Sequence, residues 1–216
     1  LGERYCTLPY FYYNQGTSAD SAVVDARYLT KAPKGLSAVE SASVWMQYMT
    51  AYFPIVELSK ASPEKCFLIP AATSTAGAAA VEIAKMYGAT VIGTTRFEYN
   101  RHYLKDLGVD HVFITDGSNL ADFIKEATNG KGIDAAFDPI GASMMSHYSP
   151  ALAKNATIYF YGLLDAQFPQ QLPLIDMFQA NATFHPYSLF NYVEDKELCE
   201  KGKAFVYRGL ESGKLK

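Results

Sequence analysis

The feature that most constrains the fold is a regular alternation of short apolar runs and longer amphipathic stretches, which starts at Lys65. Each apolar run has the length of a buried strand, and the stretches between the runs are long enough for helical crossovers. Such a succession predicts βαβ units, a parallel sheet and helices on both faces of the sheet. The predicted strands are CFLIPA, ATVIGTT, HVFIT, AAFDPI and ATIYFYG.

The part of the chain before this alternation is expected to be organised differently. Residues 1–35 predict short strands and loops, and residues 36–61 predict a helix. Pro54 is expected to break or kink that helix, because proline removes a backbone donor and clashes with the preceding turn. Ser37 is the predicted N-cap, with Glu40 at the spacing of a capping box.

Composition excludes several classes of partner. The 216 residues carry a formal net charge of -3 without a cluster of basic residues, so nucleic acid is not an expected partner. No apolar run approaches the roughly 20 residues needed to span a bilayer. No signal peptide is visible, so the expected location is the cytoplasm. Because the chain begins with Leu1 and not with Met, we expect a fragment of a longer protein.

The turn after the first predicted strand is the candidate cofactor-binding feature. A dinucleotide-binding turn usually reads G-x-G-x-x-G, whose glycines let backbone N–H groups approach a pyrophosphate at a helix N-terminus. Here the three glycine positions hold Ala72, Ser74 and Gly77. By pattern alone, an ordinary strand–helix corner is an almost equally good interpretation. The candidate pyrophosphate-binding residues are Ala72, Thr73, Ser74, Thr75, Ala76 and Gly77.

The end of the second predicted strand favours NADP(H) over NAD(H). An NAD site usually has Asp or Glu at this place, which accepts hydrogen bonds from the ribose 2′-hydroxyl. This chain has Thr95 followed by Arg96, and Arg101 lies five residues further on. A guanidinium binds a 2′-phosphate through paired hydrogen bonds, whereas a carboxylate would repel it. The alternative interpretation of Arg96 is a solvated surface arginine.

Four blocks of the sequence together resemble the medium-chain dehydrogenase/reductase superfamily: TAYFPIVELSKASPEKCFLIPAATSTAGAAAVEIAKMYGATVIGTTR, LGVDHVFIT, NGKGIDAAFDPIGA and ATIYFYGLL. Within it, the chain resembles the zinc-independent quinone oxidoreductase and enoyl reductase branch. The resemblance implies an α/β fold, with a Rossmann-type doubly wound parallel sheet in residues 36–216. Residues 1–35 would be the remnant of a GroES-like β domain that binds substrate, and the rest of that domain would be missing.

The resemblance also implies roles for individual residues. Thr50 would lie near the nicotinamide ribose and phosphate, and Arg96 would bind the 2′-phosphate. Relatives commonly have Lys where this chain has Asn100, a departure for which Arg101 would compensate. The loops after the fourth and fifth strands would lie beside the cofactor, through Asp138, Pro139, Gly141, Gly162 and Leu163.

No metal site is predicted. Zinc-dependent relatives have Cys four residues before the Thr that matches Thr50, and this chain has Met46 there, whose thioether is a poor ligand for Zn²⁺. The three cysteines are far apart, and the four histidines share no ligand spacing. No catalytic residue is assigned. Four tyrosines are candidate proton donors: Tyr10, Tyr12, Tyr13 and Tyr48.

The expected activity is NADPH-dependent transfer of hydride to a quinone, an enone or an enoyl-type substrate, in which positioning replaces a metal. Two alternatives are a zinc-type alcohol dehydrogenase, which Met46 disfavours, and a non-catalytic NADP(H)-binding module. The expected partners are a small carbonyl or quinone substrate and a second copy of the chain. The two copies would pair through an exposed edge strand after NATFHPYSLF.

Overall fold

The structure is a computed structural model that describes residues 2–11, 16–166 and 171–216. The chain forms two compact units, of which the first comprises Leu1–Thr50 with Ser188–Lys216 and the second comprises Ala51–Tyr187. Candidate tyrosines Tyr12 and Tyr13 lie outside the described residues. The expected division into a GroES-like remnant (1–35) and a Rossmann domain (36–216) stays a prediction.

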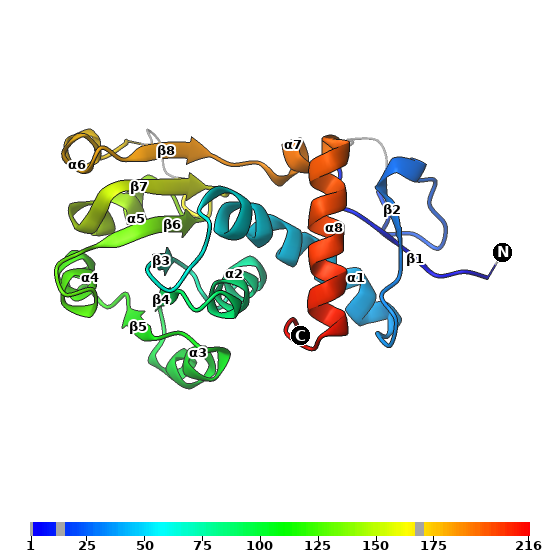
Figure 1. The fold of residues 1–216 in the computed structure, drawn as a ribbon, viewed down its shortest axis with the longest axis horizontal. Coiled ribbons are helices and arrows are strands. Elements are labelled where there is room, and N and C mark those ends of the chain that lie inside the picture. Colours follow the sequence, from blue (N-terminus) through cyan, green and yellow to red (C-terminus); the bar gives the residue numbers. More distant parts are fainter. Residues whose placement is uncertain (1, 12–15, 167–170) are drawn as a thin grey trace. The chain divides into compact units, whose positions relative to one another are not determined.

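Within its described residues, the second unit is built on a six-stranded sheet whose neighbouring strands all pair in parallel. Figure 1 shows this sheet with its strands labelled. The strand order is β5-β4-β3-β6-β7-β8, which is the order of a doubly wound Rossmann sheet. This confirms the predicted fold class. The strands are β3 (Cys66–Ile69), β4 (Thr90–Thr95), β5 (His111–Ile114), β6 (Ile133–Asp138), β7 (Leu152–Phe160) and β8 (Thr183–Pro186). The edge strand β8 lies inside the NATFHPYSLF segment and not after it.

Helices cover both faces of this sheet (Figure 1), because right-handed crossovers that run in opposite directions from the reversal of strand order between β3 and β6 place their helices on opposite faces. One face carries α2 (Thr75–Met86) and α3 (Arg101–Leu107), which pack together, and the other carries α4 (Leu120–Ala127) and α5 (Ala142–Tyr148). The shorter elements of this unit are η2 (Phe53–Leu58), η3 (Glu98–Asn100), η4 (Ser149–Ala151) and α6 (Leu174–Ala180).

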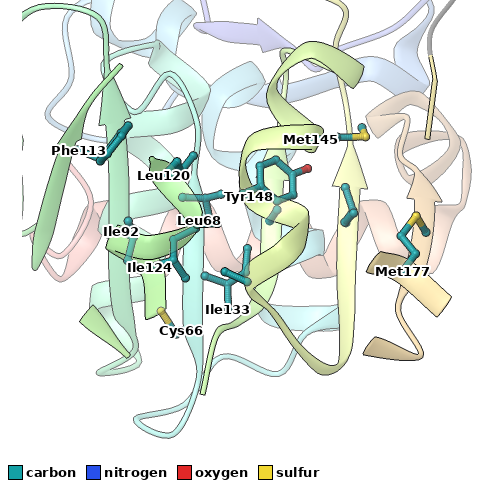
Figure 2. Packing of buried hydrophobic residues seen from close by; sticks show 14 residues of the cluster. Cys66, Leu68, Ile92, Phe113, Leu120, Ile124, Ile133, Met145, Tyr148 and Met177 are labelled. Carbon is teal, nitrogen blue, oxygen red and sulfur yellow. The ribbon is translucent and has the colours of Figure 1, made fainter. Parts of the chain in front are cut away.

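A continuous apolar core lies between the sheet and the layer that contains α4 and α5 (Figure 2). All four residues of β3 are buried, as expected for a central parallel strand covered on both faces. Alternation along β3 sends Cys66 and Leu68 into this core. Its labelled members in Figure 2 are Cys66, Leu68, Ile92, Phe113, Leu120, Ile124, Ile133, Met145, Tyr148 and Met177.

Two aspartates hold the amino-terminal ends of the central strands. The carboxylate of Asp134 accepts a 2.8 Å hydrogen bond from the backbone N–H of Cys66, where β3 begins. The carboxylate of Asp110 accepts a bond of the same length from the N–H of Val91, near the start of β4. Each aspartate also pairs with a lysine ammonium at 2.7 Å. The backbone N–H groups of Cys66 and Val91 therefore have acceptors at the amino-terminal end of the sheet, opposite to the carboxyl-terminal ends of the strands.

Within its described residues, the first unit contains a two-stranded antiparallel sheet and three α-helices. The sheet pairs β1 (Tyr5–Thr7) with β2 (Leu29–Lys31), which follows η1 (Ala26–Tyr28). The helices are α7 (Leu189–Glu194), α8 (Lys196–Glu211) and α1 (Ala38–Tyr52), whose last two residues belong to the second unit.

The start and end of α1 follow the sequence signals. The predicted capping box is confirmed, because the Ser37 N–H donates to the Glu40 carboxylate at 2.7 Å and the Glu40 N–H donates to the Ser37 hydroxyl at 3.2 Å. At Pro54 the chain does not leave the helical path but widens into the π-helical turn η2. None of the helices within the described ranges is long and apolar enough to cross a membrane.

Candidate functional site

A cavity of about 750 Å³ lies in the second unit where the loops after β3, β4, β5 and β6 meet. In a doubly wound sheet, ligands bind outside the carboxyl ends of the strands, where the strand order reverses. That reversal lies between β3 and β6, since the chain leaves β3 toward β4 and later returns to β6. The lining residues are Ala71, Thr73, Ser74, Thr94, Thr95, Arg96, Phe97, Tyr99, Asn100, Thr115, Ile140, Met144, Leu164 and Asp165.

The turn between β3 and α2 is held by its own hydrogen bonds. Ser74 is the N-cap of α2, and its hydroxyl accepts a bond from the N–H of Gly77 at 3.1 Å. The Ala72 N–H donates to the Thr94 carbonyl at 3.0 Å, which ties the turn to β4. Ala71 has a φ of 49°, in the left-handed region that a residue with a Cβ seldom adopts. Strained backbone of this kind is often found where a ligand binds.

Position 77 in this turn has no space for a side chain. A Cβ at this position would lie 2.6 Å from the Ala71 carbonyl oxygen and 3.0 Å from the Ala72 Cα, so the backbone has no space for it. The close packing of α2 against the end of β3 therefore needs glycine here, which is the role of the third glycine in a dinucleotide-binding turn.

The end of β4 carries the cationic part of the cavity. Thr95 is buried, and the exposed Arg96 that follows it lines the cavity. The Arg96 guanidinium carbon lies 5.4 Å from the centre of the Phe97 ring. Asn100 donates a 2.9 Å hydrogen bond from its amide to the Thr95 hydroxyl.

The other predicted arginine, Arg101, has different contacts. Its guanidinium donates to the Glu98 carboxylate at 2.9 Å and to the Val112 carbonyl at 3.1 Å. The pairing with Glu98 raises the pKa of Arg101. Within the described part of the chain, Arg101 does not line the cavity. A role of Arg101 in binding phosphate stays a prediction, for which the guanidinium would have to leave these partners.

The loop between β6 and α5 is shaped by a buried carboxylate. Asp138 is fully buried, and one of its oxygens accepts hydrogen bonds from the N–H groups of Ile140 at 2.7 Å and Gly141 at 3.2 Å. Its other oxygen accepts a 2.8 Å bond from the Tyr148 hydroxyl. Burial raises the pKa of Asp138, although these three donors act in the opposite direction. Asp138 thus holds the loop, and Ile140 is the loop residue that lines the cavity.

The loop after β7 completes the cavity. The N–H of Leu164 donates to the Pro139 carbonyl at 2.8 Å, and the N–H of Asp165 donates to the Ile140 carbonyl at 3.2 Å, so the loops after β6 and β7 are joined. Gly162 packs on Pro139, where a Cβ would lie 3.1 Å from the carbonyl oxygen. Leu163 is 43% exposed and precedes the two residues that line the cavity.

Thr50 is the one predicted cofactor-binding residue that lies in the first unit, where it is part of α1. It is buried, and its hydroxyl donates to the carbonyl of Met46 at 2.5 Å. Its predicted role near the nicotinamide stays a prediction.

Several lining residues were missed by sequence reasoning, among them Phe97, Tyr99, Thr115, Met144 and Asp165. Thr115 follows β5, and the rule that ligands lie beyond strand ends would have indicated it. Phe97 and Tyr99 carry no signal of their own in the sequence, because only the structure shows that both rings are exposed and stacked on each other.

The sequence profile of the zinc-binding dehydrogenases matches residues 76–197, which is more than half of the chain. The chain belongs to the zinc-binding dehydrogenase family. This places it in the medium-chain dehydrogenase/reductase superfamily and confirms the resemblance found in the sequence.

Known relatives of this zinc-binding dehydrogenase chain include two sequences of different size. A mycocerosic acid synthase-like polyketide synthase of Mycolicibacterium smegmatis is 28% identical over 93% of this chain but only 10% of its own length. A 2-haloacrylate reductase of a Burkholderia species is 27% identical over 100% of this chain and 65% of its own length. The chain therefore spans a small part of the first relative and about two thirds of the second.

Solved structures show the same fold. The Escherichia coli quinone oxidoreductase, solved in complex with NADPH, has a TM-score of 0.81 and 21% identity, over 88% of this chain and 59% of its own.

The residues present do not fit the zinc that the family name suggests. Within the described ranges, no three His, Cys, Asp or Glu side chains gather in a way that could hold a metal ion. Each of Cys6, Cys66 and Cys199 is buried with a free thiol, and the Cys6 thiol donates to the Ser41 carbonyl at 3.3 Å. That the complete protein has no metal stays a prediction.

Proposed function

We propose that this chain binds NADP(H) in the cavity at the β3–β6 reversal. In the complete protein, it would reduce a conjugated carbonyl or quinone without zinc. The observation that carries the proposal is the position of Arg96. It lines the cavity directly after β4, where a site for the unphosphorylated coenzyme would place a carboxylate.

Charge favours the phosphorylated coenzyme at this end of the cavity. A guanidinium offers planar paired donors that match a 2′-phosphate. The carboxylate nearest in sequence, that of Glu98, is engaged with Arg101. One carboxylate, that of Asp165, lines the same cavity from the loop after β7.

The turn after β3 supplies the chemistry that a pyrophosphate needs. The first N–H groups of a helix have no partner within the helix, and they carry the positive end of its dipole. Here Thr75 begins α2 behind the cap residue Ser74, and both Thr73 and Ser74 line the cavity. Hydroxyls at these two positions can donate to phosphate oxygens where glycine would offer only backbone.

The part of this chain in the reaction is to bind, orient and exclude water. A bound reduced nicotinamide supplies the hydride. Ile140, Met144 and Leu164 give the cavity an apolar wall, and Asp138 fixes the loop that carries Ile140. Of the candidate proton donors, Tyr48 is buried and its hydroxyl donates to the Lys216 carbonyl at 2.5 Å, so it is not assigned to catalysis.

Relatives support the reductase class. One is called a 2-haloacrylate reductase, and the quinone oxidoreductase of similar fold was solved with NADPH. The alternatives differ in their requirements. A zinc-type alcohol dehydrogenase would lose activity on treatment with a chelator, and a non-catalytic module would bind NADPH yet fail to oxidise it with quinones or enones in the complete protein.

Calorimetric titration of the chain with NADPH and NADH tests the proposal. We expect NADPH to bind more tightly, and we expect Arg96→Ala to weaken NADPH binding about tenfold or more, since charge-assisted hydrogen bonds are lost, with NADH unaffected. Arg208→Ala, at an exposed arginine on α8, is the matched control. Binding of neither coenzyme, or equal weakening of both by Arg96→Ala, would contradict the assignment.

We also propose that two copies associate through β8. Among the residues that the structure describes, this strand pairs with β7 alone, so its other edge is the one that would pair with a second copy. Beside it, α6 exposes Leu174, Ile175 and Phe178, the last of these 87% exposed. Light scattering should give the mass of a dimer, and Phe178→Glu should lower it to that of a monomer. A monomeric wild-type chain would contradict this proposal.

A further inference from the structure

We propose that Phe97 and Tyr99 are positioning residues that hold the Arg96 guanidinium at the cavity and thereby set the preference for a 2′-phosphorylated nucleotide. The inference rests on the proposed function. It adds two residues that would act through Arg96, without themselves being ligands of the phosphate.

The geometry is a short ladder of three side chains on the segment after β4. The Arg96 guanidinium carbon lies 5.4 Å from the centre of the Phe97 ring, within the range of a cation–π interaction. The Phe97 and Tyr99 rings are stacked, with 5.1 Å between their centres and 9° between their planes. All three residues line the cavity.

Both rings of the ladder are exposed to solvent. Phe97 is 46% exposed and Tyr99 is 77% exposed, so neither ring is there to fill the apolar core. Each ring nevertheless has a defined partner, and the parallel stacking limits the rotamers that Phe97 can adopt.

The consequence concerns the entropy of Arg96. An exposed arginine samples many rotamers, and ordering it on a ligand opposes binding. A guanidinium already held over a ring has lost part of that freedom before the ligand arrives.

On the described segment after β4, no other cation lines the cavity and could bind a phosphate in place of Arg96. Between Thr94 and Arg101, Arg96 is the one cation that lines the cavity. Arg101 donates to Glu98, and the Asn100 amide donates to the Thr95 hydroxyl. Any phosphate that enters at the end of β4 therefore depends on the orientation of Arg96.

The test is titration of the chain with NADPH, NADH and adenosine 2′-monophosphate. We expect Phe97→Leu to weaken binding of the two 2′-phosphorylated ligands about threefold, the size of a cation–π contact at an exposed site, with NADH unchanged. Tyr99→Leu should act in the same direction, and Phe97→Tyr, which keeps a ring, should restore wild-type affinity. Tyr103→Leu, at a 49% exposed tyrosine of α3, is the control.

A double-mutant cycle separates positioning from direct contact. If Phe97 acts through Arg96, Phe97→Leu has no further effect once Arg96 is replaced by alanine. Equal weakening of NADPH and NADH, or an unchanged affinity in Phe97→Leu, would overturn the inference while Arg96 could keep its proposed role. A wild-type chain that binds neither coenzyme overturns the proposed function and this inference together.

Discussion

The hydroxyl of Tyr148 donates a 2.8 Å hydrogen bond to the carboxylate of Asp138, and both side chains are fully buried. Asp138 ends β6, next to the point where the strand order reverses, and its other oxygen holds the loop at Ile140 and Gly141. A residue on the helix that follows the loop therefore satisfies the carboxylate that shapes the loop.

Removing the hydroxyl of Tyr148 should destabilise the chain. Tyr148→Phe leaves the buried carboxylate short of one donor, which costs about 1–3 kcal/mol of the free energy of unfolding. Urea unfolding at pH 7 measures the loss. Tyr103→Phe, at an exposed position, should stay within about 0.5 kcal/mol of the wild type. A similar stability of the two variants would show that the buried bond contributes little.

Asp138 should give stability a recognisable dependence on pH. Burial raises its pKa above 3.8, so the folded chain keeps this proton at pH values where the unfolded chain has released it. The contribution to stability is therefore complete below pH 3.8 and is lost as the pH rises through the folded-state pKa.

Asp138→Asn removes this titration. Denaturant unfolding at a series of pH values measures the free energy of unfolding of the variant and of the wild type. We expect the value of the variant minus that of the wild type to increase as the pH rises from 3.8. A difference that does not change with pH would contradict the raised pKa.

Gly77→Ala should disturb the turn before α2. The added methyl would lie 2.6 Å from the Ala71 carbonyl oxygen, so the backbone must shift, at a cost of about 1–3 kcal/mol. The thermal unfolding midpoint is the measurement. Gly16→Ala is the control, because nothing lies within 4 Å of its added methyl. If both substitutions shift the midpoint equally, the close approach of the backbone at Gly77 does not contribute to the stability of the chain.

Asp134→Ala should loosen the start of β3. It removes the acceptor of the Cys66 N–H and an ion pair with Lys131, and we expect a loss of about 1–3 kcal/mol in urea unfolding. Asp106, whose contact with His102 on α3 is exposed, gives the comparison. Asp106→Ala should change stability by less than about 0.5 kcal/mol. The reverse order of the two effects would refute the role given to Asp134.

Cys66 should be unreactive in the folded chain. Burial raises the pKa of its thiol to about 12, so the reactive thiolate is scarce at neutral pH. Labelling with a disulfide reagent at pH 8, followed by mass spectrometry, should modify Cys66 only after denaturant is added. Rapid labelling without denaturant would show that β3 is more accessible than the structure indicates.

The fold was largely predictable because strand and helix patterns are local. Five of the six parallel strands were found from apolar runs, and the capping box at Ser37 was read directly from its spacing with Glu40. Pro54 was harder, because the helix continues past the proline by widening into the π-helical turn η2 instead of breaking.

The site was only partly predictable because it depends on contacts between loops. Thr73, Ser74, Thr95 and Arg96 were expected at the cofactor and do line the cavity. Arg101 shows the limit, since its spacing from Arg96 gives no sign of its pairing with Glu98.

The hydrogen bonds of Asp134 and Asp110 at the starts of β3 and β4 have a consequence for how the sequence of such a chain can evolve. Because Asp134 and Asp110 bind the strand starts at the amino-terminal end of the sheet, their contacts do not depend on the loops at the carboxyl-terminal end. Substitution of an exposed loop residue such as Arg96 can therefore alter which ligand is preferred without removing these contacts. The packed residues Gly77 and Asp138 beside these loops do not share this freedom, so ligand preference can change at only some of the positions at this end.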